Sequence, residues 1–284
     1  MITLNLRGGL GSQLFQLCTL ISHSIKHSKS FIIPYSDKLY SDKSCSEDSI
    51  NKTYWETLFD NVKPYTSGNG RFKDIDHINQ LLLTKHPIYK ETSFNYKIID
   101  ESVDNVCFDG KFQSFKYFNH YKDKLILAFN IAHKQLLIQS EYFEYLDKHN
   151  IASMSIAMCD EDNTNPFVGE DYYDEALALI PVDYRILVFY NKPDKDGVDA
   201  IINNLKMKHK HDFVYVNSEI EDWKQMLLMS LCRVNIIANN NFSWWGAYLN
   251  KDAEKVYYPS VWFNKDCKDN TKDLFLPEWE MIEI

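Results

Sequence analysis

The first residues of the chain place a glycine-rich turn where a helix is expected to begin. A short apolar run is followed by the tract Arg7-Gly-Gly-Leu-Gly-Ser-Gln13 and then by a helical pattern of apolar residues. Glycines allow positive φ and the close approach of a ligand, and the free N–H groups at a helix start favour phosphate. The spacing matches neither a dinucleotide-binding fingerprint nor a P-loop. The tract therefore predicts either a phosphate-binding turn or a plain tight turn capped by Ser12.

A second group of polar residues lies near the carboxyl end. Asn239, Asn240, Asn241 and Ser243 follow an apolar run at residues 234–238, and a helical pattern begins beside them. Three amides, a hydroxyl and a helix start supply hydrogen-bond donors and acceptors for a sugar or a phosphate. Asparagine and serine are also ordinary helix caps, and the tryptophans that follow can simply be packed. Both interpretations stay open on these residues alone.

Both groups follow expected strands, so the arrangement of the strands decides what the groups can reach. In the second half of the chain, strands are expected at 152–158, 185–189, 213–216, 234–238 and 256–258, and helices at 171–179, 198–207, 222–231 and from 244 onward. This alternation is typical of a parallel, doubly wound α/β sheet. Such a sheet binds its ligands beyond the carboxyl ends of its strands.

The first half of the chain is less regular. Strands are expected at 2–6, 31–33 and 106–110, a short helix near 54–59 within the polar region 41–71, and a long helix over 123–146. The end of the long helix marks the predicted boundary. We therefore expect an amino-terminal domain at residues 1–150 and a carboxyl-terminal domain at residues 151–284.

Composition narrows the classes of protein. The 284 residues carry a formal net charge of −9, which argues against binding nucleic acid through the overall field. No apolar run approaches the roughly 18 residues that span a bilayer, and no signal peptide is expected. The six cysteines are widely spaced and lack zinc-ligand spacing, so we expect reduced thiols, a cytoplasmic location and no metal site. Peripheral attachment to a membrane stays open.

Several tracts together resemble glycosyltransferase family 11, which contains the α-1,2-fucosyltransferases. They are residues 7–16, 228–232, 235–239, 242–249 and 256–263. The resemblance implies an α/β, GT-B-like fold, in which two Rossmann-type domains face a cleft and the carboxyl-terminal domain holds GDP-fucose. It also implies an inverting, metal-independent transfer of L-fucose to a hydroxyl group of a glycan acceptor, without a cofactor. The amino-terminal domain would then serve the acceptor and carry the glycine turn.

The chain departs from the family in its donor-binding motifs. The family's His-x-Arg-Arg-x-Asp motif aligns with residues 155–160, where Ala157 and Met158 replace both arginines and only Asp160 matches. Guanidinium groups bind a diphosphate in a bidentate way and offset the charge of the leaving group, which neutral side chains cannot do. The family's Phe-Ser-Asp-Asp motif appears as residues 189–192, and its acidic pair is lost.

The resemblance and the turn chemistry together single out the residues of the site. Those expected to bind the donor are Gly9, Gly11, Ser12, Gln13, Lys192, Asn239, Asn241, Phe242, Ser243 and Trp244. Ser12 stands where the family usually has asparagine. Arg7, Lys192 and Arg233 are the candidate replacement cations for the diphosphate, although Arg233 fits a solvated surface charge better.

The candidate general base is Asp160, which would accept the proton of the acceptor hydroxyl. Its neighbours Glu161 and Asp162 are expected in a solvated loop. Three functions stay open: a fucosyltransferase, a glycosyltransferase that uses a different nucleotide sugar, and a glycan-binding homologue with impaired catalysis. The lost arginines favour the second and third, whereas the intact tract at 242–249 favours the first and second.

Overall fold

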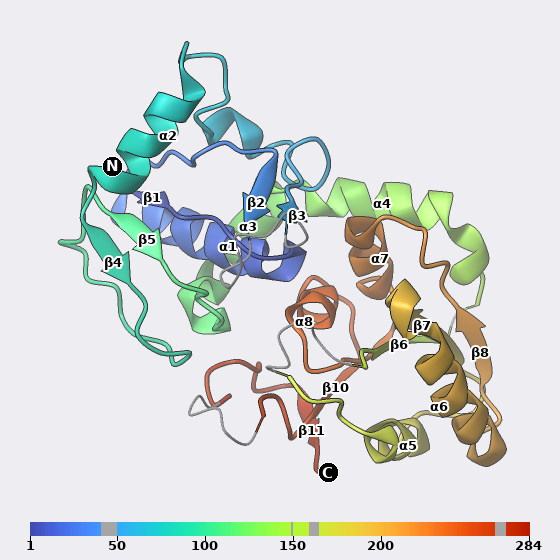
Figure 1. The fold of residues 1–284 in the computed structure, drawn as a ribbon. Helices are drawn as coiled ribbons and strands as arrows, with labels where there is room; N and C mark the ends of the chain where they lie inside the picture. The colour runs from blue at the N-terminus through green and yellow to red at the C-terminus, as the bar shows by residue number, and fades with distance from the viewer. Residues whose placement is uncertain (41–49, 149, 159–164, 265–270) are drawn as a thin grey trace. The chain divides into compact units, whose positions relative to one another are not determined.

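The chain folds into two compact units. The computed structural model (Figure 1) describes residues 1–40, 50–148, 150–158, 165–264 and 271–284. Unit 1 comprises Met1–Ile131 and Asp269–Phe275, and unit 2 comprises Ala132–Lys268 and Leu276–Ile284. The chain thus passes between the units at residue 131, whereas the sequence places a boundary at residue 150.

Unit 2 is built on one six-stranded parallel sheet. The strands are β6 (Ile151–Ile156), β7 (Arg185–Tyr190), β8 (Asp212–Tyr215), β9 (Val234–Ile236), β10 (Lys255–Pro259) and β11 (Glu280–Ile282). They lie in the order β11-β10-β9-β6-β7-β8, and every neighbouring pair is parallel. The five strands that the sequence predicts are confirmed as β6 to β10. The short strand β11 was not predicted.

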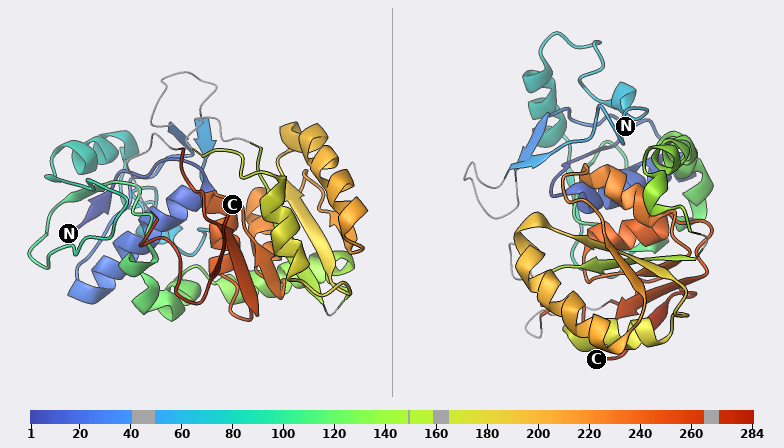
Figure 2. Two further views of the ribbon diagram at one scale, coloured as in Figure 1. Left: turned by 90° about the horizontal axis from the view of Figure 1, so that it is seen from below. Right: turned by 90° about the vertical axis from the view of Figure 1, so that its right-hand side faces the viewer.

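Helices cover both faces of this sheet. They are α5 (Glu170–Ala178), α6 (Lys195–Lys208), α7 (Asp222–Met229), α8 (Asn241–Tyr248) and the single 3₁₀ turn η6 (Lys192–Asp194). From β6 to β8 the connections advance across the sheet in one direction, and from β9 to β11 they advance in the other. Because such crossovers are right-handed, α5 and α6 cover one face while α7 and α8 cover the other, as Figure 2 shows.

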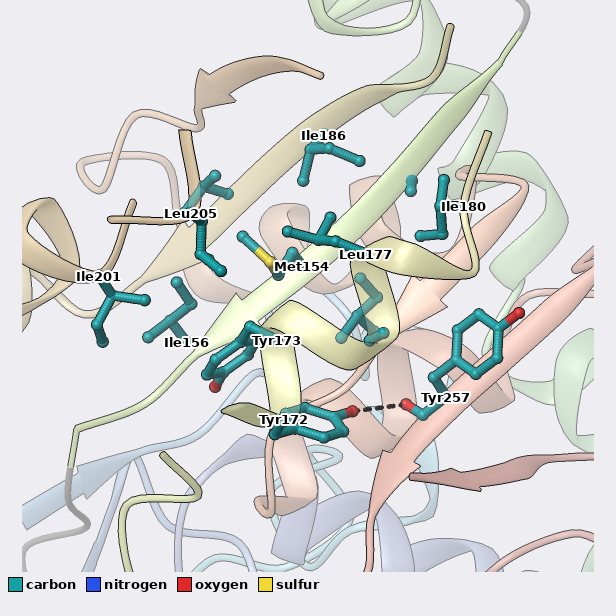
Figure 3. Packing of buried hydrophobic residues seen from close by; sticks show 14 of the residues in the cluster. Met154, Ile156, Tyr172, Tyr173, Leu177, Ile180, Ile186, Ile201, Leu205 and Tyr257 are labelled. Carbon is teal, nitrogen blue, oxygen red and sulfur yellow. Dashed lines mark hydrogen bonds between the residues drawn. The ribbon is translucent and has the colours of Figure 1, made fainter. Parts of the chain in front are cut away.

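The core under α5 is apolar and includes a buried hydroxyl (Figure 3). Tyr172 of α5 belongs to the same buried cluster as Met154 and Ile156 of β6. Its hydroxyl donates to the carbonyl oxygen of Ile237 at 2.7 Å and lies 3.0 Å from that of Tyr257. Burial raises the pKa of this phenol well above its usual value, so it stays a neutral donor. The helix thereby holds the chain just beyond β9 against β10.

A buried amide network supports β9 from within. The Asn235 Nδ2 donates to Ser153 Oγ at 2.7 Å and to the Met229 carbonyl oxygen at 2.8 Å. Its Oδ1 accepts a hydrogen bond from Asn250 Nδ2 at 2.9 Å. Because each of these groups is buried, every bond replaces one to water that folding removes. The network fixes β9 against β6 and α7.

Unit 1 has a smaller parallel sheet. Its strands are β1 (Thr3–Leu4), β5 (Cys107–Asp109) and β4 (Ile88–Lys90), in the order β1-β5-β4, and a separate antiparallel pair joins β2 (Lys38–Tyr40) to β3 (Ile50–Lys52). Isolated parallel bridges join residues 2 and 31 and residues 33 and 66. Because both units are built on parallel sheets, the α/β prediction is confirmed.

The helices of unit 1 differ from the prediction in three places, one of which is the unpredicted α2. They are α1 (Leu10–His27), α2 (Ile75–Thr84), α3 (Lys122–Ala128) and the 3₁₀ turns η2 (Lys63–Tyr65), η3 (Phe115–Tyr117) and η4 (Asn119–Tyr121). The long helix predicted over 123–146 is wrong: α3 ends at Ala128, and Asn130 has φ +51° before α4 (Ile131–Glu141) and the 3₁₀ turn η5 (Phe143–Tyr145) follow. A left-handed residue ends helical hydrogen bonding. The region 54–59 forms turns rather than a helix.

Two further expectations concern the whole chain. Among the described cysteines, Cys18, Cys107 and Cys232 are buried and free, as the sequence predicts for reduced thiols. Within the described ranges, none of the helices combines the length and the apolarity that a membrane crossing requires.

A buried histidine makes the stability of unit 1 depend on pH. His23 of α1 is 6% exposed and packs edge-on against Phe108. Burial, with repulsion from His27, Lys29 and Lys26, lowers the pKa of His23 from 6.5 to about 4. The neutral imidazole is therefore favoured in the folded state, and its contribution to stability is present above pH 6.5 and is lost as the pH falls towards 4.

We expect this group alone to lower the free energy of unfolding by roughly 3 kcal/mol between pH 7 and pH 4. A His23→Gln variant should lose less stability over the same interval, because the titrating group is gone. Urea denaturation at pH 7, 5.5 and 4 measures the difference, with His77→Gln on the exposed surface of α2 as the control. Equal acid sensitivity of wild type and His23→Gln would contradict the prediction.

Candidate functional site

The strand order of unit 2 reverses at one edge of the sheet, which is where doubly wound sheets form their ligand crevice. The chain proceeds from β6 to β7 on one side and later places β9 on the other side of β6. At such a reversal, the connections after the two strands diverge to opposite faces, and ligands bind beyond the carboxyl ends. Residues 157–158 follow β6 here, and residues 237–243 follow β9. The topology therefore places residues 157–158, which belong to the segment aligned with the family's arginine motif, at the same sheet edge as residues 237–243.

The candidate base lies outside the described residues. Asp160, Glu161 and Asp162 belong to the range 159–164, so their predicted roles stay predictions. The described chain ends at Met158 on one side of this range and resumes at Asn165 on the other.

Asn239 ties three segments together at this edge. Its Nδ2 donates to the carbonyl oxygens of Pro166 at 2.7 Å and of Trp262 at 3.2 Å, and its own carbonyl oxygen accepts from Asn165 Nδ2 at 2.5 Å. The residue is 2% exposed. The connections after β6, β9 and β10 are therefore joined at this edge through one buried residue.

The start of α8 is capped by a residue that the donor-binding prediction omits. The Oδ1 of Asn240 accepts from the Ser243 N–H at 2.8 Å, and the Ser243 hydroxyl donates to the Ala238 carbonyl oxygen at 3.1 Å. Ser243 and Trp244 are buried, whereas Asn241 and Phe242 are half-buried. In the first turn of α8, Asn241 and Phe242 thus keep partial exposure, whereas Ser243 and Trp244 do not. The sequence contains a sign of this cap, because an asparagine stands three residues before the serine whose N–H group it accepts from.

The methionine that replaces a family arginine is packed against a helix. Met158 contacts the core beside β6, and a Cβ at Gly197 of α6 would lie 2.8 Å from its terminal methyl carbon. Its backbone N–H lies 3.4 Å from Asp194 Oδ2. The side chain fills space between β6 and α6, so this position supplies packing instead of positive charge.

Two of the candidate cations lie at opposite edges of the unit 2 sheet. Lys192 follows β7 at the carboxyl edge, is 72% exposed and pairs with Glu219 at 2.5 Å, which raises its pKa. An exposed pair of this kind is weak and exchanges partners readily. Arg233 precedes β9, pairs with Glu254 and bonds Asn150 at 3.2 Å. Arg233 therefore lies at the amino edge, away from the crevice.

The glycine turn of unit 1 is held by two glutamines. Gln16 Nε2 donates to the Arg7 carbonyl oxygen at 2.9 Å, and its Oε1 accepts from the Arg7 N–H at 3.1 Å. Gln13 Nε2 donates to the carbonyl oxygens of Gly8 at 2.9 Å and of Lys52 at 2.8 Å. The fully buried Gln13 Oε1 has no partner within the described ranges. Gln13 thus positions the turn from inside.

The helix that follows the turn begins without a side-chain cap. Gly8 has φ +78°, and a Cβ there would lie 3.0 Å from the Ser12 Cβ. The cap of α1 is Gly9, with no side-chain cap, so the interpretation of Ser12 as the cap is wrong. Gly9 is exposed, Ser12 is half-buried and Gly11 is buried. The first N–H groups of α1 therefore suit an anion.

Arg7 pairs with a carboxylate of the neighbouring strand. Its guanidinium contacts Asp109 at the end of β5, and both side chains are about three-quarters buried. Asp109 was not predicted as a site residue. Because the pair is neutral overall, Arg7 is half of an ion pair and not an isolated cation.

Within the described ranges, no group of three or more His, Cys, Asp or Glu side chains could hold a metal ion. A surface hollow of about 350 Å³ in unit 1 is lined by Asp60, Lys63, Pro64, Gly68, Asn69 and Arg71. None of these residues belongs to the predicted site.

Comparisons with known proteins bear on the family. Residues 167–283 match the family described as glycosyl transferase family 11. The chain is 24% identical over 310 residues to the O-antigen biosynthesis glycosyltransferase WbnK of Escherichia coli, which covers 96% of this chain and 98% of that protein. It is also 24% identical over 292 residues to an alpha-1,2-colitosyltransferase of Escherichia coli, with 99% of each covered.

Two solved structures are also similar. The fucosyltransferase NodZ from Bradyrhizobium has a TM-score of 0.48 at 13% identity, over 90% of this chain and 94% of that one. FUT1 of Arabidopsis thaliana, in complex with GDP, has a TM-score of 0.47 at 13% identity, over 90% and 69%. The sequence resemblance is confirmed by the family match and the full-length relatives. The chain is thus similar to glycosyl transferase family 11 over residues 167–283, and to two glycosyltransferases over nearly its whole length.

Proposed function

We propose that this chain is an inverting glycosyltransferase that moves L-fucose from GDP-fucose to a hydroxyl group of a glycan acceptor. The observation that supports the proposal is the joining, at the switch point of the unit 2 sheet, of the tract after β9 to residues 165–166, which follow the range that contains Asp160. Asn239 makes this junction with bonds of 2.5 and 2.7 Å. The crevice is where a doubly wound sheet binds its ligand.

The reaction is a direct displacement at the anomeric carbon. The acceptor oxygen forms a bond to this carbon while the bond to the phosphate oxygen breaks, so the nucleoside diphosphate leaves with the electron pair. Asp160 takes the proton from the acceptor hydroxyl. The backbone N–H groups at the start of α8 offset the charge that develops on the leaving group. The first turn of α1 offers the same chemistry in unit 1.

A different nucleotide sugar is the second candidate donor. Met158 fills its position by packing against α6, so no guanidinium from this position meets the diphosphate. A relative matched along 99% of both chains is an alpha-1,2-colitosyltransferase, which shows that a protein of this length and similarity uses another sugar. The two donors can be distinguished by direct binding.

Thermal shift against GDP, GDP-fucose, UDP and dTDP sugars tests the proposal. A ligand at a hundred times its dissociation constant stabilises the folded protein by about 2.7 kcal/mol, which raises Tm by several degrees. Stabilisation by guanine nucleotides and transfer of fucose with inverted anomeric configuration would support the first donor. Stabilisation by GDP without fucose transfer would favour the second, and no response to any nucleotide would favour a glycan-binding protein.

A further inference from the structure

The surface hollow of unit 1 lies outside the residues of the predicted site. Its volume is about 350 Å³, and its lining residues all lie within the range 60–71, which belongs to unit 1. Binding sites for small molecules in proteins begin at roughly 300 Å³. The hollow is therefore large enough for one sugar residue, and the chemistry of its lining decides which ligand it fits.

One wall of the hollow is glycine backbone packed against an aromatic ring. A Cβ at Gly68 would lie 2.5 Å from Tyr35 Cγ, which is closer than side-chain carbons approach. The Tyr35 N–H donates to Ser67 Oγ at 2.8 Å, and its ring stacks on that of Trp55 with the ring centres 6.2 Å apart. Any side chain at position 68 would displace this ring, so the shape of the wall requires glycine.

The backbone that carries the two cations of the hollow is held by side-chain hydrogen bonds. Asn69 Nδ2 donates to the Pro64 carbonyl oxygen at 3.0 Å, and Asn69 Oδ1 accepts from the Arg71 N–H at 3.0 Å. Thr66 Oγ1 donates to the Lys63 carbonyl oxygen at 2.7 Å. A ligand would therefore meet walls that are already formed, which reduces the entropy lost on binding.

The lining carries more positive than negative charge. Lys63 and Arg71 are cations and Asp60 is an anion, whereas the whole chain has a formal net charge of −9. Lys63 pairs with Glu56, whose side chain is 73% exposed, and an exposed pair of this kind exchanges partners readily. Arg71 is exposed, so a ligand in the hollow can reach its guanidinium.

We propose that this hollow binds a carboxylate-bearing sugar residue of the acceptor saccharide. The planar guanidinium of Arg71 matches a carboxylate in a bidentate way, and the Lys63 ammonium donates a further charge-assisted hydrogen bond. Asp60 accepts hydrogen bonds from the sugar hydroxyl groups. One carboxylate balances the excess of one cation in the lining, whereas a phosphate monoester carries nearly two negative charges. The assignment rests on the proposed function, in which unit 1 serves the acceptor.

Two disaccharides that differ in a single group test the role of the charge. One ends in glucuronic acid and the other in its neutral carboxamide, and calorimetric titration of the wild-type chain measures both affinities. We expect the acid to bind at least tenfold more tightly, because the carboxamide lacks the charge-assisted bonds to Arg71 and Lys63. Equal affinities for the two disaccharides, or no binding of either, would overturn the proposal.

Two variants locate the preference for the acid. Arg71→Gln should bind the two disaccharides equally and, because the position is exposed, should keep the Tm of wild type. Lys85→Gln removes an exposed cation of unit 1 outside the hollow and should keep the preference. A preference that survives in Arg71→Gln, or is also lost in Lys85→Gln, would show that the hollow does not produce it.

Further outcomes distinguish this proposal from the proposed function. The Tm shift produced by GDP should be the same in wild type and Arg71→Gln, and its loss in the variant would place Arg71 at the donor instead. Tighter binding of inorganic phosphate than of the acidic disaccharide would also overturn the proposal. A wild-type chain that responds to no nucleotide would contradict the proposed function, and the comparison of acid with carboxamide would still decide whether the hollow binds an acidic sugar.

Discussion

Replacing Asp160 with asparagine should lower kcat for sugar transfer by roughly 10²- to 10⁴-fold while nucleotide binding is kept. A positioned general base contributes about this much by taking the proton of the attacking hydroxyl as the new bond forms. Asparagine has nearly the same size but cannot accept that proton at neutral pH. Initial rates with saturating GDP-fucose and acceptor measure kcat, and the thermal shift with GDP measures binding.

The neighbouring acids provide matched controls for this prediction. Glu161→Gln and Asp162→Asn each remove a charge at an adjoining position, and we expect each to change kcat by less than about threefold, because the sequence predicts solvated charges there and such charges interact weakly. Asp160→Asn activity equal to that of the controls would assign the base to another carboxylate. A loss of GDP binding in Asp160→Asn would point to donor binding instead of proton transfer.

Asn239→Ala should weaken donor binding at least tenfold and lower the free energy of unfolding by about 1–3 kcal/mol. The carbonyl oxygens of Pro166 and Trp262 lose their partner when the amide is removed, and unpaired buried groups carry a cost of this size. The connections after β6 and β10 are then no longer joined to β9, so the crevice loses its fixed shape. Calorimetric titration with GDP and urea denaturation measure the two effects.

A variant of a second buried asparagine distinguishes an effect on the shape of the donor site from an effect on the stability of the protein. Asn235 lies four residues earlier and bonds Ser153 and Met229 inside the core. We expect Asn235→Ala to destabilise the protein by a similar or larger amount, while the folded variant binds GDP like wild type. If Asn239→Ala also kept its affinity, the junction would serve stability alone, and the switch-point crevice would no longer support the proposed donor site.

Most of unit 2 could be predicted from the sequence. The strands β6 to β10 are apolar segments that other residues separate in the sequence. The tract from Asn239 to Trp244 has a spacing that can be explained by interactions between neighbouring residues. Periodicity, caps and turns depend on residues a few positions apart, which is the range that a single sequence reveals. The missed strand β11 and the helix break at Asn130 carry weak local signals: three residues in the first case and one left-handed asparagine in the second.

The sequence alone predicts the fold class and the resemblance to a family, and it indicates the residues of the two polar tracts at 7–13 and 239–243. Only the tertiary structure decided which of these residues meet and what each does. It joined the segments after β6, β9 and β10 through Asn239, placed Arg233 at the opposite sheet edge and paired Arg7 with Asp109. The physical reason is that strand order and hydrogen-bond partners arise from contacts between residues far apart along the chain. Spacing within a tract carries no information about those contacts.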